Sequence, residues 1–480
     1  MKTILFAIVC SIAIFSPHLL QSKHIEARSV NQIVLTPEQL PDFREVYIHT
    51  VSDVQFYDVY ITNLTTAMNV VAEYPLMISL DCYSDFAQEL TLVPASGVID
   101  QRVFVRAHPG SSGEFHPVIT HTTTSAGSAE LATQVTGIPP QIPQGYYITA
   151  TSVGHELKTQ LHNIIKGHNT LGYNSLWTHF RQTDVTFSGF VWDIYSDIPC
   201  SEPPYLFVFG EDQDTGSGGN IEGDVYNREH SMPRSWFGGD VNPMNSDMYH
   251  IYPVDKHVNA VRNNYPFGMV ASPTWTSLNG GKLGANTAGD HYTGTAFEPI
   301  DEYKGDLARA FLYMITRYED RIEDWTYSEE GNTMFDHNTF PGYEPWAIEM
   351  LMEWHRNDPV SQRERLRNDL IYELQGNRNP FVDYPVFAEK IWGDTTVFVN
   401  NPDYPIDVTI YPNPAGESFV FSSPEIIERL EIFSTAGKQM LIHLPAKASE
   451  TIDISALDTG VYIVRFFSSS VSGSQLLMVR

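Results

Sequence analysis

Alternating apolar and polar residues characterise the first third of the chain. The segments FYDVYITNL and QRVFVRAHP alternate in this way and are rich in Val, Ile, Phe and Tyr, which favours half-buried β-strands. Loops containing Gly, Pro and Ser separate such segments at spacings typical of a sandwich. The pattern predicts an Ig-like β-sandwich over residues 30–138, followed by a stiff, proline-rich linker over residues 139–145.

A change to helical spacing marks a second, α+β domain, predicted over residues 146–393. Apolar residues recur every three or four positions in two segments, which predicts amphipathic helices. A third helix is expected to begin with Asp358 as its N-cap and Pro359 in its first turn, and to end at Gly376. The apolar helix positions are Leu157, Leu161, Ile164 and Ile165 in the first segment and Leu307, Phe311, Met314, Ile315 and Tyr318 in the second.

Short β-strand patterns return near the C-terminus. Residues 405–480 contain alternating segments around turn signals such as DTG, which predicts a small β-sandwich. The predicted fold class is therefore multidomain: an Ig-like β-sandwich, a central α+β domain and a small C-terminal β-sandwich.

Residues 1–22 have the features of a signal peptide. Lys2 supplies the positive start, and the apolar run from Ile4 to Phe15 is too short to span a bilayer. No later segment is apolar and long enough to cross a membrane, so no stable membrane span is expected. These features predict an exported protein that is secreted or held at the cell surface.

The chain contains three cysteines. Cys10 is expected to leave with the signal peptide, and Cys82 and Cys200 then remain. Because these two residues fall in different predicted domains, we expect them not to pair.

The net charge argues against nucleic-acid binding when it is taken alone. The chain has 58 acidic and 29 basic residues, a formal charge of −29. Phosphate recognition needs positive potential. A nucleic-acid enzyme of this composition must gather its few cations along one groove.

The segment YNREHSMPRSW, residues 226–236, holds the first candidate chemistry. A carboxylate such as Glu229 is a hard oxygen ligand suited to Mg²⁺ or Ca²⁺. Its neighbour His230 would point to the other side of a strand and could act as a base on water. An ordinary polar pair is the alternative when this segment is considered by itself.

The segment DMYHIYPVDKHVNAVRNNYPFG, residues 247–268, supplies the second part of the candidate site. Asn259, on a short helix after a β-ribbon, can present its carbonyl oxygen to the same ion, the layout of a ββα-metal site. His250 is either a partner of the site residues or a structural histidine. Asn263 and Asn264 are expected to serve the turn that follows.

Four segments in order resemble the endonuclease I family of periplasmic and secreted bacterial DNases and some extracellular RNases. They are NREHSMPRSWF, DMYHIYPVDKHVNAVRNNYPFG, FEPIDEYKGDLARAFLYMITRY and QGNRNPFVDYP. The resemblance implies that His230 is the general base and that Glu229 and Asn259 are the protein ligands of one Mg²⁺, with Mn²⁺ or Ca²⁺ as alternatives. It also implies products with 5′-phosphate ends.

The family uses an arginine to hold the scissile phosphate, and the resemblance does not by itself locate it in this chain. The candidates, in order of preference, are Arg262, Arg234 and Arg378. Arg262 is therefore expected to be catalytic together with His230.

The C-terminal segments YPNPAGE, LEIFSTAGK and LDTGVYIVRF resemble the sorting domain of the type IX secretion system. The resemblance implies export by the type IX secretion machinery. A terminal lysine is commoner in such domains than Arg480, and a plain β-sandwich binding module is the alternative.

The expected function is a secreted, metal-dependent nuclease with little sequence specificity, acting on DNA, RNA or both. The alternative is a catalytically inactive surface protein that binds nucleic acid or serves adhesion. The intact set of Glu229, His230 and Asn259 argues against that alternative.

Overall fold

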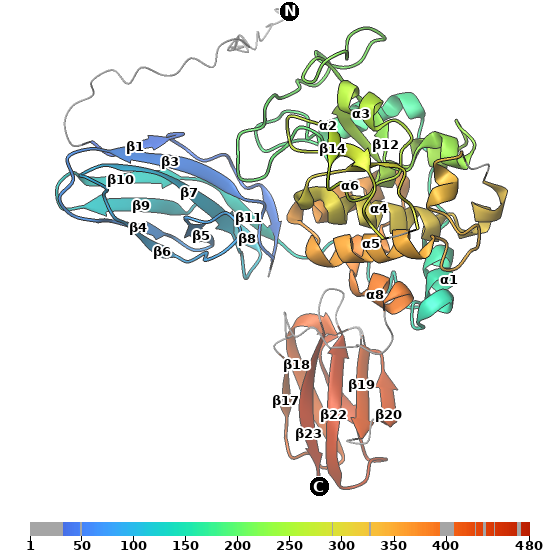
Figure 1. Ribbon diagram of the computed structural model, residues 1–480. Helices are drawn as coiled ribbons and strands as arrows, with labels where there is room; N and C mark the ends of the chain where they lie inside the picture. The colour runs from blue at the N-terminus through green and yellow to red at the C-terminus, as the bar shows by residue number, and fades with distance from the viewer. Residues whose placement is uncertain are drawn as a thin grey trace, which may run out of the picture.

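The computed structural model (Figure 1) shows a β-rich N-terminal part, a helix-rich central part and a β-rich C-terminal part. The predicted signal peptide, residues 1–22, and the start of the predicted sorting domain lie outside the described residues. Within the described part of the chain, no helix combines the length and the apolar character needed to cross a membrane. The structure describes residues 32–48, 50–289, 291–325, 328–393, 408–427, 429–434, 438–445, 447–467 and 472–480.

The N-terminal part is built from β-strands, as its alternation predicts. Its strands are β1 (Val34–Thr36), β2 (Glu45–Tyr47), β3 (Gln55–Ile61), β4 (Met68–Ala72), β5 (Leu76–Ser79), β6 (Glu89–Leu92), β7 (Ile99–Ala107), β8 (Gly113–Phe115), β9 (Val118–Thr123), β10 (Gly127–Ala132) and β11 (Val135–Ile138). Two four-stranded sheets, β1-β3-β7-β5 and β10-β9-β4-β6, contribute to one apolar core, and β2-β11-β8 form a third sheet. Every second residue of β3 is buried. The Ig-like assignment of this part stays a prediction.

The N-terminal sheets are fastened to the central part. The side chain of Gln362 accepts hydrogen bonds from the backbone N–H of Tyr47 (3.2 Å) and the hydroxyl of Thr50 (3.2 Å), and donates to the carbonyl of Glu45 (3.1 Å). This amide thereby bonds to backbone groups of β2 and to the hydroxyl of Thr50 just beyond it. These hydrogen bonds hold the N-terminal part against the central part, in addition to the covalent linker between them.

Cys82 and Cys200 form a disulfide with a Cα–Cα distance of 6.0 Å, so the prediction that they do not pair is wrong. Cys82 follows β5, whereas Cys200 lies in the central part, 118 residues later. Sequence position separates them, but docking of the two parts brings their loops together. The bond adds a covalent link to the noncovalent interface.

Removing this link is expected to destabilise the protein. Replacing Cys82 and Cys200 by serine should lower the free energy of unfolding by roughly 2–4 kcal/mol, because the unfolded chain regains the freedom of a long loop. Urea unfolding, followed with and without reductant, measures the effect. The double variant serves as control, since reductant should not change its transition. An unchanged wild-type transition under reductant would contradict the prediction.

The central part is mixed α and β, as expected, and its main elements are helices. Its helices are α1 (Gly154–Ile165), α2 (Leu176–Thr183), α3 (Lys256–Arg262), α4 (Lys304–Arg317), α5 (Pro345–Asn357), α6 (Gln362–Gln375), α7 (Pro380–Asp383) and α8 (Val386–Trp392), and a 3₁₀ turn, η1 (Tyr173–Ser175), leads into α2. Its strands are β12 (Tyr226–His230), β13 (Ile251–Asp255), β14 (Pro273–Thr276), β15 (Lys282–Ala285) and β16 (Thr295–Glu298). Helix α4 is buried along its whole length and forms the centre of the core.

The helix boundaries agree only in part with the sequence patterns. The helix predicted to end at Gly376 does so, and Gly376 adopts a left-handed conformation with φ of 79°. Its N-cap, however, is Ser361, which forms a capping box with Glu364. The predicted N-cap, Asp358, instead ends α5 and accepts a hydrogen bond from the N–H of Gly305 (2.8 Å). Tertiary contact with α4 therefore takes Asp358 out of the capping role.

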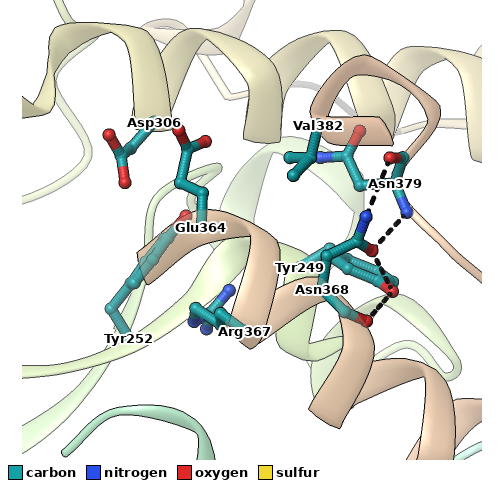
Figure 2. A pocket seen from close by; sticks show the side chains of 8 residues that line it. All are labelled: Tyr249, Tyr252, Asp306, Glu364, Arg367, Asn368, Asn379 and Val382. Carbon is teal, nitrogen blue, oxygen red and sulfur yellow. Dashed lines mark hydrogen bonds between the residues drawn. The ribbon is translucent and has the colours of Figure 1, made fainter. Parts of the chain in front are cut away.

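A cavity of about 20 Å³ beside β13 has room for about one water molecule. In Figure 2, Asn368 joins Tyr249 and Asn379 by hydrogen bonds. Arg367 donates to the carbonyl of Ile251 at 2.8 Å and so supports the start of β13 from α6. The cavity contains none of the candidate site residues. Its lining residues are Tyr249, Tyr252, Asp306, Glu364, Arg367, Asn368, Asn379 and Val382.

The C-terminal part is again all strands in the residues described. They are β17 (Thr409–Tyr411), β18 (Ser418–Ile427), β19 (Arg429–Ser434), β20 (Gln439–His443), β21 (Lys447–Asp453), β22 (Gly460–Phe467) and β23 (Ser472–Val479). The sheets β17-β18-β21 and β20-β19-β22-β23 share one apolar core. The β-rich character predicted for this region is confirmed.

Candidate active site

A two-stranded ribbon followed directly by a helix carries the candidate residues. Strands β12 and β13 pair antiparallel, with Glu229 opposite Tyr252 and His230 opposite Ile251. Helix α3 begins immediately after β13, because the side chain of Asp255 accepts a hydrogen bond from the N–H of Val258 (2.9 Å) and caps the helix. This is the strand–strand–helix order that the sequence predicts for the candidate site.

Helix α3 lies against one side of β12. Asn227 and Glu229 share that side, because alternate residues of a strand point the same way. Asn259 donates to the Oδ1 of Asn227 (2.8 Å), and Arg262, one helical turn later, donates to the Oε1 of Glu229 (3.1 Å). The structure thus brings Glu229 and Asn259 to the same side of the ribbon.

The carboxylate of Glu229 is buried, with 3% of the residue exposed. Its Oε1 accepts hydrogen bonds from Arg262 and from the hydroxyl of Tyr195 (3.0 Å). Its Oε2 accepts none from the residues that the structure describes. Burial raises the pKa of Glu229 to about 7, and the charge of Arg262 and the hydrogen bond from Tyr195 oppose that rise. A bound cation would favour the ionised carboxylate.

His230 lies on the opposite side of β12, as an adjacent strand residue must. Its Nε2 lies 3.2 Å from the carbonyl oxygen of Asn245, which can only accept, so Nε2 carries a proton and donates. Its Nδ1 then keeps a lone pair and makes no hydrogen bond within the described chain. Burial lowers the pKa of His230 well below its usual value, and the neighbouring His250 lowers it further. The resting imidazole is neutral and can accept a proton.

His250 packs against the candidate base. The two imidazole rings meet edge to face, with their centroids 5.4 Å apart. The Nε2 of His250 is 2.8 Å from the carbonyl of Met244, which fixes the ring. His250 is therefore a buried residue that packs against His230 and is not exposed to solvent.

The three arginine candidates have different surroundings. Arg262 is 1% exposed, and its guanidinium is engaged by Glu229 and by backbone carbonyls. Arg378 is equally buried and pairs with Asp383. Arg234 has 44% of its side chain exposed and pairs with Asp240. Of these three, only Arg234 presents its guanidinium to solvent.

Arg228 was not among the predicted phosphate contacts, although the structure places it on the same side of β12 as His230. Its guanidinium lies over the rings of Tyr173 (3.7 Å) and Trp177 (4.5 Å). It forms no ion pair with a carboxylate in the described residues. The sequence could have indicated Arg228 as a candidate, because residues two positions apart on a strand lie on the same face, and Arg228 is two positions from His230.

The oxygen donors of the candidate site suit a hydrated ion better than one held by protein ligands alone. No group of three or more His, Cys, Asp or Glu side chains suited to a metal occurs in the described residues. Mg²⁺, however, keeps several waters and needs only one or two carboxylates plus substrate oxygens. The unengaged Oε2 of Glu229 and the Oδ1 of Asn259, which accepts no hydrogen bond from the described chain, fit such a hydrated ion.

The central part of the chain is similar in sequence to known nucleases. The family model for endonuclease I matches residues 153–386. The extracellular ribonuclease of Bacillus subtilis (strain 168) is 35% identical over 244 residues, which cover 50% of this chain and 75% of the relative. The extracellular ribonuclease of Bacillus amyloliquefaciens is 33% identical over 282 residues, covering 56% and 86%.

A more distant relative is the extracellular deoxyribonuclease of Aeromonas hydrophila, 26% identical over 144 residues, 30% of this chain and 52% of that one. Residues 409–480 match the model of the secretion system C-terminal sorting domain. The protein is therefore secreted or located at the cell surface, as predicted. The extent of the match to the two ribonucleases decides the family: the chain belongs to the endonuclease I family of nucleases.

Proposed function

We propose that this protein is a secreted, metal-dependent endonuclease in which His230 activates water and Glu229 and Asn259 hold one Mg²⁺. Mn²⁺ and Ca²⁺ are the alternative ions. The observation that carries the proposal is the state of His230: a neutral imidazole with Nε2 tied to a carbonyl and Nδ1 left to accept a proton. On the other side of the same strand, one carboxylate oxygen of Glu229 accepts no hydrogen bond from the described residues, and Asn259 lies on that side as well.

The chemistry follows from these positions. Nδ1 of His230 takes a proton from water as the water oxygen attacks phosphorus, and the P–O3′ bond breaks. The hydrogen bond from Nε2 to Asn245 keeps the ring oriented and supports the positive charge that it gains. When bound, the metal ion neutralises charge on the phosphoryl and departing oxygens. The departing O3′ oxygen takes up a proton from solvent, so the products carry a 5′-phosphate and a 3′-hydroxyl.

Arg262 holds Glu229 in place in this proposal and does not contact substrate. Its buried guanidinium binds Glu229 together with the carbonyls of His230 (3.1 Å) and Ser231 (2.6 Å). Instead, the more accessible Arg228 and Arg234 bind the substrate phosphate. Both arginines contribute to lowering the pKa of His230, after burial and His250, which places their charges near the base.

Both DNA and RNA fit this chemistry, because attack by water requires no 2′-hydroxyl. The relatives support both substrates, since two are named extracellular ribonucleases and one an extracellular deoxyribonuclease. The sorting domain supports export by the type IX secretion machinery. Little sequence specificity is proposed.

Metal removal provides the direct test. Full-length protein is expected to nick plasmid DNA or degrade RNA with Mg²⁺, and to lose activity in EDTA. Without the ion, Glu229 and Asn259 supply no positive charge to stabilise the attacked phosphate. Gel assays with Mg²⁺, Mn²⁺ or Ca²⁺ restored after EDTA measure this. Activity that survives EDTA treatment would overturn the metal role. Nucleic-acid binding without cleavage in any of the ions would favour the inactive surface protein.

A further inference from the structure

A row of aromatic and arginine side chains runs away from His230 along α2. Tyr173, Trp177 and Arg181 follow one another at intervals of four residues, so they lie on one side of the η1–α2 segment. Arg228 lies between the first two, 3.7 Å from the ring centroid of Tyr173 and 4.5 Å from that of Trp177. Arg181 lies over the ring of Phe209 at 5.4 Å. We call Tyr173, Arg228, Trp177, Phe209 and Arg181 the α2 strip.

The strip begins at the proposed base. The rings of Tyr173 and His230 are 5.7 Å apart, and Trp177 contacts Tyr226 at the start of β12 (5.6 Å). Figure 1 shows α2 close to β12. From Tyr173 to Arg181 the helical rise corresponds to about 12 Å, enough for a few nucleotides. A strand bound at His230 can continue directly onto this strip.

The arginines of the strip differ from most others near the core. Arg309, Arg367 and Arg378 each pair with a carboxylate. Arg228 and Arg181 make no ion pair within the described residues, although the chain has twice as many acidic as basic residues. Arg181 is exposed, and Arg228 is partly exposed. Two cations without carboxylate partners therefore lie beside partly exposed aromatic rings.

We propose that the α2 strip binds an unpaired segment of the nucleic-acid substrate next to the scissile bond. Arg228 and Arg181 contact its phosphates, and its bases stack on the accessible parts of Trp177 and Phe209. Bases within a duplex already stack on one another and cannot offer their faces, so this surface favours a single strand. The inference rests on the proposed function and adds the form of nucleic acid that the site accepts.

Binding and cleavage can be measured separately. Full-length protein carrying His230→Ala is titrated with a labelled single strand of about 20 nucleotides, and with the blunt duplex of the same sequence, in fluorescence anisotropy. Further variants add Arg181→Ala, Trp177→Leu or Trp177→Phe. Arg356→Ala is the matched control, because Arg356 is exposed on α5 and pairs with Glu389.

The single strand is expected to bind more tightly than the duplex. Trp177→Leu should weaken single-strand binding about five-fold or more through lost stacking, whereas Trp177→Phe should retain most of it. Arg181→Ala should also reduce the salt dependence of binding, by roughly 0.7 in the slope of log affinity against log salt. Arg356→Ala should match the parent protein.

Equal binding of duplex and single strand, or an Arg181→Ala variant that binds with parental affinity and salt dependence, would overturn the strip proposal. Arg181 is exposed, so this result does not depend on whether Trp177→Leu folds. Failure of the proposed function looks different: protein with His230 intact would then cleave neither form with Mg²⁺, whatever its affinity.

Discussion

Replacing His230 with alanine is expected to slow phosphodiester cleavage by roughly 10²–10⁴-fold, the usual contribution of a positioned general base. The variant leaves water without a proton acceptor at the position of Nδ1. Its fold should be retained, because within the described residues the side chain makes a single hydrogen bond, to the carbonyl of Asn245. Initial rates at saturating Mg²⁺, together with circular dichroism, measure both properties.

The matched control for this variant is His155→Ala. His155 is exposed on α1, in a different part of the central domain from β12 (Figure 1). We expect the control to cleave at the wild-type rate. A His230→Ala protein that is folded and cleaves within a few-fold of wild type would remove His230 from the mechanism.

Arg262→Met is expected to lower the free energy of unfolding by about 3–5 kcal/mol, the range for breaking a buried ion pair from one side. The loss leaves Glu229 buried without its charged partner, and it leaves the carbonyls of His230 and Ser231 without a donor. Urea unfolding provides the measurement. The exposed Arg356→Met variant is the comparison and should change stability little.

A double-mutant cycle sharpens this prediction. Glu229→Gln combined with Arg262→Met should be less destabilised than the sum of the single variants, because no unpaired charge then remains. Arg262→Met could instead leave stability intact and only raise the KM for substrate. That outcome would return Arg262 to the phosphate-binding role for which it was the first of three candidates in the sequence.

The sequence was sufficient to place the candidate residues where the signal is local. Glu229 and His230 are neighbours on a strand, so their opposite directions follow from strand geometry alone. The positions of Asn259 and Arg262 follow from a helix beginning directly after β13. What the sequence does not reveal is burial: in the folded protein Arg262 is 1% exposed, with its guanidinium bonded to Glu229 and lying over the ring of Phe267.

Features that depend on contacts between distant segments were not predictable. The patterns assign β-strands and helices correctly to the two larger parts, but not how these parts dock, so the pairing of Cys82 with Cys200 was missed. Asp358 resembles an N-cap in the local sequence, yet it bonds to Gly305 of α4. In both cases a tertiary contact outweighs the local preference.

The oxidation state of Cys82 and Cys200 also indicates whether a molecule has been exported. Thiols stay reduced in the bacterial cytoplasm, and disulfides form once a chain reaches an oxidising compartment. A molecule with free Cys82 and Cys200 has therefore not completed its passage out of the cytoplasm, whereas an exported one has lost both reactive thiols. Thiol labelling of cell fractions can thus distinguish newly made molecules from delivered ones, without any change to the enzyme.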